Sequence, residues 1–596
     1  MTIAPAVRRL ALLAALTLAA CGGGGSTPAW APGQPLTVAV GSTFPAGTAV
    51  RDAYSGRTAT VDAAGNVTLP TDAGPGVLLL ERDGAAASHF DWNDATVYFV
   101  MTDRFMNGDP SNDAAYGRQK DGASEIGTWH GGDLSGLTAK LDYIQALGAT
   151  AVWITSPVEQ VHGWVSGGSA GDFKHYGYHG YWALDFTRLD RNLGTPADLQ
   201  SFVDAAHARG LRVLLDVVLN HPGYATGADL TTYLPEVWKD GTGAAFAAWS
   251  PGPRQTFTNW NDLVNYNSYG WLNWWGKTWV RADFPGYTIP GSDDLTTSLS
   301  YLPDFITEAT TPAVFPTLLT RKAATADGTG AVAIAGDTVR QYLVGWHADW
   351  VRQYGFDGFR CDTVKNVEQP AWHDLKVAAT QALADWKAAN PLKKIDDAPF
   401  WMTGEVYGHG IQKDGYYSTG GFDSLINFSF QPAVRDLMTA QPTLVDAAPQ
   451  LEALYASMAG ALRAQANFEV LSYLSSHDTR LFYGDILKYD PVRQREAGTA
   501  LLLAPGAVQI FYGDESGRRL GPAGSDATQG TRSDMNWSTT EAAILDHWKK
   551  LGAFRKRHAA VGAGAHQQLT SPAGTYAFSR TLAGGDAVVV VVTRPR

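Results

Sequence analysis

Eight short apolar runs, separated by segments with helical periodicity, constrain the fold of this chain more than any other feature. From about residue 91 the two patterns alternate, and such alternation is typical of βαβ units with a parallel sheet. Eight strands of this kind predict an α/β fold, a (β/α)8 or TIM barrel. The predicted strands are Thr96–Asp103, Thr150–Pro157, Arg212–Leu219, Phe356–Asp362, Phe400–Val406, Ser424–Phe428, Val470–Ser475 and Ala507–Tyr512.

Two of the intervening helices show their boundaries in the sequence. Thr195 is a typical N-cap, Pro196 takes the first helical position, and Gly210 closes the helix. Apolar residues follow at i, i+3, i+4 and i+7, so one face is expected to pack on the sheet. Residues 337–354 carry the same pattern and predict a second barrel helix.

The barrel pattern is flanked at both ends and interrupted once. Residues 35–90 predict a small β module, and residues 558–596 a short C-terminal β region. The alternation stops over residues 222–302, which predicts an inserted subdomain B after the third strand and divides the barrel into 91–221 and 303–557. We expect most tryptophans of the insertion in its own core and one or two along a cleft: Trp238, Trp249, Trp260, Trp271, Trp274, Trp275 and Trp279.

The N-terminus has the pattern of an export signal. Arg8 and Arg9 precede an apolar run over residues 10–20 that is too short to span a membrane as a stable helix. The run ends Leu-Ala-Ala-Cys21, which resembles a bacterial lipobox, so residues 1–20 are expected to be a lipoprotein signal peptide and 21–34 a flexible tether. We therefore expect an exported protein, lipid-anchored through Cys21 on the periplasmic or cell-surface face of a bacterial membrane. A soluble export signal and a secreted protein are the alternative.

Composition narrows the class of partner. The net charge is −12 and the chain has no run rich in Lys or Arg, which argues against nucleic acid as a ligand. Twenty tryptophans supply aromatic faces of the kind that stack on sugars. Cys361 is the only cysteine besides Cys21, so a lipidated Cys21 leaves no partner for a disulfide. A carbohydrate ligand and a monomeric protein are expected.

Acidic residues lie at the ends of several predicted strands. In the stretch Gly355–Asn366, alternation places Arg360 and Asp362 on one face, where a structural salt bridge would be the commonest explanation for an isolated pair. Asp216, Glu405 and Asp478 lie at the ends of other strands, however, and active sites of barrels lie at that end. Carboxylates that converge there raise at least one pKa, which keeps a general acid protonated near neutrality.

The stretches around these residues resemble the ordered motifs of the α-amylase family, glycoside hydrolase family 13. They are DVVLNH (216–221), GFRCDTVKN (358–366), GEVY (404–407) and SSHD (475–478). Further similar stretches are VYFVMTDRF (97–105), GYHGYW (177–182), LPDF (302–305) and VQIFYGDE (508–515), so the resemblance extends from about Val97 to Trp537.

The resemblance implies a retaining double displacement on α-glucans. It assigns Asp362 as the nucleophile, Glu405 as the acid/base and Asp478 as the carboxylate that binds the ring hydroxyls of the reacting sugar. Arg360 would keep Asp362 ionised, and Asp216 would support the site. The remaining implied sugar contacts are His179, Tyr181, His221, His477, Lys365 and Asn366.

The chain departs from the family pattern after the nucleophile. The motif usually ends Lys-His, and here it ends Lys365-Asn366, which changes the side chain expected to contact the released sugar or an acceptor. The residue between arginine and nucleophile is Cys361, which alternation directs toward the helices, so we expect it to pack rather than to react.

Calcium is the cofactor that the resemblance implies. One loop resembles a calcium loop of the cyclodextrin glucanotransferase branch, and its oxygen-bearing residues suit a hard cation, although an ordinary Asx-rich turn would also explain them. A second site between barrel and insertion would use Asn220, Asp304 and the backbone carbonyl of Asn366. The expected first loop consists of Asn107, Asp109, Asn112, Asp113, Gly131 and Asp133.

The leading function is hydrolysis of α-1,4 bonds in starch or maltodextrins. A transglycosylase of the cyclodextrin glucanotransferase type is the alternative, although we expect no starch-binding modules after the barrel. A lipid-anchored glucan-binding protein without catalysis is a third possibility, which the intact carboxylate set disfavours. Endo or exo action, preference for chain length and tolerance of α-1,6 branches depend on the shape of the insertion and its loops.

Overall fold

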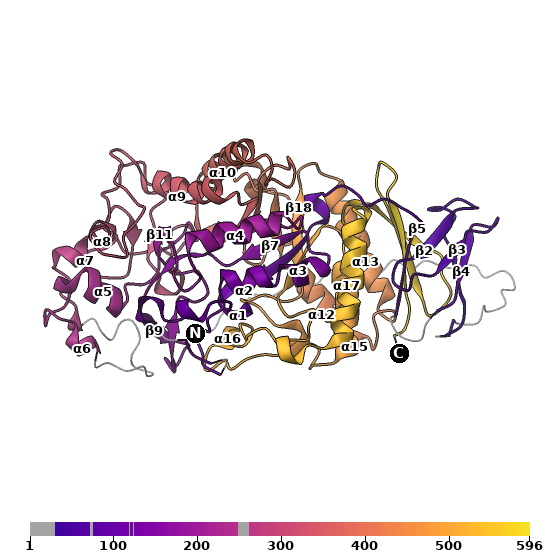
Figure 1. The fold of residues 1–596 in the computed structure, drawn as a ribbon, viewed down its shortest axis with the longest axis horizontal. Helices are drawn as coiled ribbons and strands as arrows, with labels where there is room; N and C mark the ends of the chain where they lie inside the picture. The colour runs from indigo at the N-terminus through magenta and orange to yellow at the C-terminus, as the bar shows by residue number, and fades with distance from the viewer. Residues whose placement is uncertain are drawn as a thin grey trace, which may run out of the picture.

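A closed barrel of eight parallel strands forms the centre of the molecule (Figure 1). The computed structural model describes residues 30–31, 33–71, 76–118, 120–122, 124–247 and 262–595. Each predicted strand is present, which confirms the (β/α)8 fold. The barrel strands are β6 (Thr96–Val100), β7 (Ala151–Ile154), β12 (Arg212–Val217), β15 (Gly358–Cys361), β16 (Trp401–Gly404), β17 (Ser424–Asn427), β18 (Glu469–Tyr473) and β19 (Ala507–Phe511).

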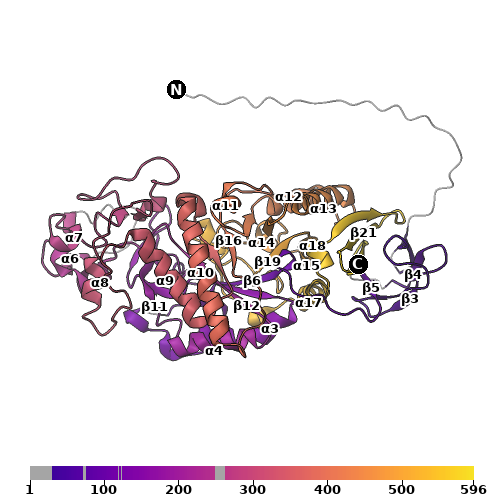
Figure 2. The ribbon, with the colours of Figure 1, turned by 90° about the horizontal axis from the view of Figure 1, so that it is seen from above.

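Helices surround the barrel, and Figure 2 shows several of them packed along its side. Thr195 begins α4 with a capping box, in which its side chain and that of Asp198 each accept from the other's backbone N–H. Gly355 ends α9 in a left-handed conformation with φ of 81°. The main helices are α2 (Leu134–Ala139), α3 (Leu141–Ala146), α4 (Pro196–His207), α9 (Val339–Tyr354), α10 (Gln369–Ala389), α12 (Phe430–Ala440), α13 (Ala448–Arg463), α15 (Pro491–Leu502) and α17 (Ala542–Arg557).

The N-terminal and C-terminal β segments form one sheet instead of two separate modules. Strand β5 (Val77–Arg82) pairs with β22 (Ala587–Val592), which joins the two ends of the described chain. Alternate residues of β5 serve different cores: Leu79 packs with the barrel cluster, and Leu80 with a smaller cluster of the terminal sheet. The other strands are β2 (Ala49–Asp52), β3 (Thr58–Thr60), β20 (Ala565–Leu569) and β21 (Tyr576–Thr581), with β1 (Leu36–Ala39) and β4 (Asn66–Leu69) paired beside them.

Two excursions leave the barrel at its opposite end from the terminal sheet (Figure 1). The first follows β7 and contains β8 (Val158–Gln160), β9 (Trp164–Gly167), β10 (Phe173–Tyr176) and β11 (Ala183–Leu189). The second follows β12 and continues until α9, further than the residue 302 that sequence pattern suggested. It contains α5 (Gly227–Tyr233), α6 (Ala244–Ala247), α7 (Tyr269–Leu272), β13 (Val280–Arg281), β14 (Asp304–Phe305) and α8 (Thr317–Lys322).

The described tryptophans of the insertion all lie in its core. Trp271, Trp274, Trp275 and Trp279 are at most 2% exposed, and Trp238 is 3% exposed. The rings pack on one another and on barrel helix α9, where Trp279 stacks against Trp346 at 5.6 Å. Those five rings do not line the central pocket, so the expectation that insertion tryptophans border the cleft is not met by them; Trp249 and Trp260 fall outside the described residues.

No helix within the described ranges is both long and apolar enough to cross a membrane. The predicted signal peptide and Cys21 fall outside the described residues, as does most of the predicted tether.

Candidate active site

Three neighbouring strands direct the acidic side chains into one end of the barrel. Strand pairing places Asp216 beside Arg360, and Arg360 beside Thr403, on β12, β15 and β16. Asp362 and Glu405 follow two residues after Arg360 and Thr403, just past the ends of their strands. Because side chains two residues apart share a face of a strand, both carboxylates point into the carboxyl-terminal mouth of the barrel.

One guanidinium holds three of the carboxylates. Arg360 Nη1 lies 2.6 Å from Asp362 Oδ1 and 3.0 Å from Asp216 Oδ1, and its Nη2 lies 3.0 Å from Glu405 Oε2. Arg360 is 1% exposed, so water screens these contacts little. The salt bridge expected between Arg360 and Asp362 is therefore one part of a larger cluster.

Asp216 is the carboxylate that is held in place by the largest number of donors in this cluster. Its carboxylate also accepts hydrogen bonds from Trp153 Nε1 at 3.0 Å and from the Tyr181 hydroxyl at 2.8 Å. Burial raises the pKa of Asp216 to about 6, against the lowering effect of Arg360 and these donors. Asp216 does not line the pocket, which agrees with the supporting role expected for it.

The turn after Asp362 donates a backbone hydrogen bond to the side chain of Glu405. Thr363 has a φ of 46°, a left-handed conformation that is strained for a β-branched residue. Its backbone N–H donates to Glu405 Oε2 at 3.2 Å, and the Glu405 backbone N–H donates to the Cys361 carbonyl at 2.8 Å. Strain of this kind is concentrated at functional sites, and here it aims a donor at a catalytic candidate.

Asp478 approaches from the end of β18 and is held by two basic groups. Arg532 Nη2 lies 2.8 Å from Asp478 Oδ1, and His477 Nε2 lies 2.9 Å from Asp478 Oδ2. Although burial acts in the opposite direction, His477 and Arg532 hold the pKa of Asp478 well below its usual range. Asp478 is therefore ionised at neutral pH.

Glu405 and Asp362 have different electrostatic environments. Burial, with the charges of Asp362 and Asp478 and against that of Arg360, raises the pKa of Glu405 to about 7. Burial also raises the pKa of Asp362, while Arg360 acts to lower it. Because Arg360 makes its shortest contact with Asp362, Asp362 is the better placed of the two to act as the ionised nucleophile while Glu405 donates its proton.

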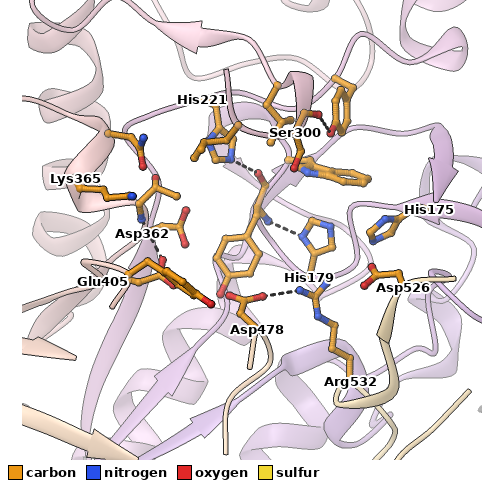
Figure 3. Close-up of a pocket in the computed structure, with 18 residues that line it drawn as sticks. His175, His179, His221, Ser300, Asp362, Lys365, Glu405, Asp478, Asp526 and Arg532 are labelled. Carbon is orange, nitrogen blue, oxygen red and sulfur yellow. Dashed lines mark hydrogen bonds and ion pairs between the residues drawn. The ribbon is translucent and has the colours of Figure 1, made fainter. Parts of the chain in front are cut away.

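These side chains border a pocket of about 540 Å³, which Figure 3 shows in close-up. Its lining brings together Asp362, Glu405 and Asp478, which come from three different strand ends. The pocket also contains most of the sugar contacts expected from sequence, namely His179, Tyr181, His221, Lys365 and Asn366.

The histidines of the pocket are neutral hydrogen-bonding groups. Burial lowers the pKa of His221 to about 4 and that of His179 well below its usual range. His179 Nδ1 accepts from the backbone N–H of Tyr181 at 3.1 Å, which leaves Nε2 as a donor. His477 is not among the lining residues; it stacks behind Tyr181 at 5.3 Å and contacts Asp478. A direct sugar contact by His477 is therefore not favoured.

Lys365 and Asn366 form the opposite wall. The Asn366 side chain donates from Nδ2 to the Asp294 carbonyl at 2.7 Å, and Lys365 Nζ lies 3.5 Å from Asp294 Oδ1. The Asn366 side-chain amide is thus engaged by the insertion. Lys365, whose side chain is one-third exposed, is the more accessible of the two for contact with a sugar. Cys361 is fully buried, and burial raises the pKa of its thiol well above the usual value, so it packs and does not react.

Sequence reasoning missed the residues that complete the far side of the pocket. Arg532 comes from a loop after β19, and His175 from strand β10, and neither belongs to a recognised motif. Trp182 could have been found, since it ends the stretch GYHGYW. Tyr407, two residues after Glu405, is 65% exposed at the pocket border.

The pocket continues into a second hollow of about 420 Å³. His175, Trp182, Tyr224, Ser300 and Asp526 border both. The shared residues His175, Ser300 and Asp526 lie at the end of the pocket remote from Glu405 and Lys365 (Figure 3).

The far border of this second hollow includes Tyr301, which is 65% exposed. Ser300 and Tyr301 have φ values of 50° and 63°, and the Tyr224 hydroxyl holds the turn by donating to the Ser300 carbonyl at 2.7 Å. The two hollows share five lining residues and therefore adjoin as one groove, and the exposed ring of Tyr301 borders the second of them.

The first expected calcium loop has free oxygens that suit a cation. Within the described residues, Asn107 Oδ1 and Asn112 Oδ1 are buried and have no hydrogen-bond donor. A Cβ at Gly131 would lie 2.5 Å from Asp113 Oδ1, so only glycine lets the side chains of Asp113 and Asn107 approach the backbone this closely. The fit is incomplete, because Lys120 Nζ lies 3.3 Å from Asp113 Oδ2.

The other residues of that loop have structural tasks. Asp133 accepts from the backbone N–H groups of Gly108 and Gly136 and caps α2, and Asp109 caps the turn at Ser111. No group of three or more acidic, histidine or cysteine side chains in the described part of the chain is arranged to hold a metal. A calcium ion would therefore depend on amide oxygens with Asp113.

The second expected calcium position does not fit a metal. Asn220 donates from Nδ2 to Asp304 Oδ1 at 3.0 Å and to the Asn366 carbonyl at 3.1 Å. Arg281 Nη1 lies 2.6 Å from Asp304 Oδ2. The oxygens expected to bind calcium are occupied by N–H donors of the chain itself.

Comparison with known proteins agrees with this geometry. The family model for the alpha-amylase catalytic domain matches residues 99–283 and 331–536. The periplasmic alpha-amylase of Escherichia coli (strain K12) is 51% identical over 579 residues, which cover 95% of this chain and 81% of that protein. A cyclomaltodextrin glucanotransferase of Thermoanaerobacterium thermosulfurigenes is 25% identical over 521 residues, which cover 85% of this chain and 61% of that protein.

Solved structures share the fold. The alpha-amylase from Geobacillus thermoleovorans, complexed with acarbose, superposes with a TM-score of 0.55 at 22% identity, covering 83% of this chain and 86% of that chain. The unmatched residues between 283 and 331 fall in the insertion, so the matched part contains every carboxylate of the site. This chain belongs to the alpha-amylase family of glycoside hydrolases and is an enzyme of the alpha-amylase type.

Proposed function

We propose that the enzyme cleaves α-1,4 bonds of starch or maltodextrins with retention of anomeric configuration. The contact of one guanidinium with both Asp362 and Glu405 is the observation that carries this proposal. Retaining glycosidases keep their two carboxyl groups about 5 Å apart, whereas inverting enzymes leave room for a water molecule between them. Two carboxylates that share one arginine are consistent with the shorter separation.

The reaction then proceeds in two displacements. Ionised Asp362 attacks the anomeric carbon, and protonated Glu405 gives its proton to the departing oxygen, which leaves a covalent glycosyl-enzyme. Glu405, now ionised, takes a proton from water as the water attacks the same carbon and releases Asp362. Asp478, fixed by Arg532, accepts hydrogen bonds from sugar hydroxyls in both steps.

The groove supports an oligomeric or polymeric substrate. Glu405, Lys365 and Tyr407 border the end where the leaving sugar departs past its proton donor. The other end continues to Tyr301, whose exposed ring offers a face for a glucose unit remote from the cleaved bond. Cyclodextrin glucanotransferase activity is the second candidate, favoured by the 25% identical relative.

We propose calcium as a structural cofactor at the loop of Asn107, Asn112 and Asp113. The orphaned amide oxygens of Asn107 and Asn112 support it. Bound there, calcium would fasten the loop and would supply no group to the reaction, because these residues do not line the pocket.

The product anomers of maltoheptaose test the proposed reaction. ¹H NMR recorded in the first minutes is expected to show α-configured reducing ends. Asp362→Ala is expected to be inactive, and Glu405→Gln to be strongly slowed. Initial β products would contradict retention, and cyclic products would favour the glucanotransferase alternative. Binding of maltoheptaose without cleavage, equal in wild type and variants, would show a glucan-binding protein instead.

Lipid attachment at Cys21 is proposed from the lipobox resemblance, and the similarity to the periplasmic alpha-amylase of Escherichia coli supports export. In a bacterial host, the wild-type protein is expected in the membrane fraction, and a Cys21→Ser variant outside it. Recovery of both proteins in the same soluble fraction would contradict anchoring and leave secretion.

The pKa of Glu405 predicts the pH dependence of kcat/KM. The rate is expected to fall as pH rises through about 7, because Glu405 loses the proton that it must donate. It falls again in acid, where Asp362 takes up a proton and can no longer attack. In Glu405→Gln the alkaline limb should vanish and kcat should decrease by about 10²–10⁴.

A second glutamate, Glu469, is the control for assigning the alkaline limb of the pH profile to Glu405. Burial raises the pKa of Glu469 to about 8, but Glu469 lies at the start of β18, away from the pocket, where it accepts from Trp401. Glu469→Gln should keep the alkaline limb near pH 7. Loss of the limb in Glu469→Gln, or its persistence in Glu405→Gln, would contradict the assignment.

A further inference from the structure

An arginine of the chain fills the position where sequence motifs place a cation between the barrel and the insertion. Arg281 and Asp304 lie directly opposite each other in the antiparallel pair β13–β14. Arg281 Nη1 is 2.6 Å from Asp304 Oδ2, and Nη2 contacts Glu308. Asp304 is 1% exposed, so this ion pair is shielded from water.

The neighbouring donors complete a closed network. The Asn220 amide group donates to Asp304 Oδ1 and to the Asn366 carbonyl, at 3.0 and 3.1 Å. Asn220 Oδ1 lies 3.0 Å from His221 Nδ1, which can donate to it. Each of these oxygens therefore has an N–H partner. A metal ion would have to displace the guanidinium, since two cations beside one buried carboxylate repel each other strongly.

We propose that Arg281 replaces a metal ion at this junction. Its guanidinium fastens the insertion to the end of β12 through Asp304. Through Asn220 it also positions two residues that line the catalytic pocket, His221 and Asn366. Arg281 is thus a positioning residue, and the junction between barrel and insertion is metal-free.

A second buried cation joins the two excursions in the same manner. Lys322, at the end of α8, places Nζ 2.8 Å from Glu159 Oε2 and 3.1 Å from Asp185 Oδ2. All three side chains are at most 1% exposed. Since Glu159 and Asp185 belong to β8 and β11, the ammonium group of Lys322 connects the first excursion with the insertion without a metal.

Metal content and thermal unfolding test the proposal independently of enzyme activity. Asp113→Ala removes the separate loop that could hold calcium, so that only the Arg281 junction remains. After equilibration with calcium and gel filtration, elemental analysis is expected to find no bound calcium in Asp113→Ala. The unfolding midpoint of Asp113→Ala should be the same in calcium and in EDTA.

Removal of the guanidinium should create the missing metal site. Asp113→Ala/Arg281→Ala leaves Asp304 and Glu308 without their cation, so the midpoint in EDTA should fall by roughly 5 °C. Added calcium should bind to this variant and restore much of the loss. Asp113→Ala/Arg281→Lys retains a cation and should not gain calcium dependence. Arg352→Ala, at an exposed ion pair on α9, is the control for loss of an arginine.

Two results would overturn the proposal. One is calcium bound to Asp113→Ala that disappears when Asp304→Asn is added, which would place a metal at the junction. The other is an Asp113→Ala/Arg281→Ala variant that folds but has the same unfolding midpoint in calcium as in EDTA. If Arg281→Ala fails to fold, the metal content of Asp113→Ala and Asp113→Ala/Asp304→Asn still decides between the two accounts.

Discussion

The contact of Arg360 with three buried carboxylates is the interaction on which the site depends. A single guanidinium cannot balance three ionised carboxylates in a medium of low polarity, so at least one of them retains a proton near neutral pH. Glu405 is the carboxyl group that retains the proton, because it lies near the charges of Asp362 and Asp478 and its pKa is raised to about 7. Asp362, with the shortest contact to Arg360, is the carboxylate best placed to ionise.

The barrel makes this arrangement possible by its register. Parallel pairing sets Asp216, Arg360 and Thr403 in one row, and the next inward-facing residues supply Asp362 and Glu405. Asp478 has its own partners, His477 and Arg532, which lower its pKa together with the more distant charge of Arg360. Asp478 therefore has a role in the proton transfer besides binding sugar hydroxyls, because its negative charge helps to keep Glu405 protonated.

Local sequence patterns predicted the barrel because they depend on neighbours in the chain. Period-two alternation placed Arg360 and Asp362 on one face, and the capping residue Thr195 marked the start of α4. Long-range partners left no such signal. The pairing of β5 with β22 joins Leu79 to Val590, and Arg532 reaches Asp478 from a loop without a recognised motif.

The expected calcium sites also depended on a long-range partner that local sequence patterns did not reveal. Motif position placed Asn220 and Asp304 near each other, which the structure bears out, but it could not identify the cation between barrel and insertion. Arg281 is 23 residues from Asp304 in the chain, and only the β13–β14 pairing brings them together. A carboxylate motif predicts that a positive charge is needed, and tertiary structure decides whether a metal or a side chain supplies it.

The central claim is that Asp362, aligned by Arg360, forms a covalent bond with the sugar. Mass spectrometry of Glu405→Gln after exposure to α-maltosyl fluoride tests it most directly, since fluoride leaves without help from an acid and the slowed second step lets the intermediate accumulate. The account predicts a maltosyl adduct on the peptide that contains Asp362, and no adduct in Asp362→Asn/Glu405→Gln. An adduct on another residue, or fluoride release without any adduct and with inverted product, would contradict it.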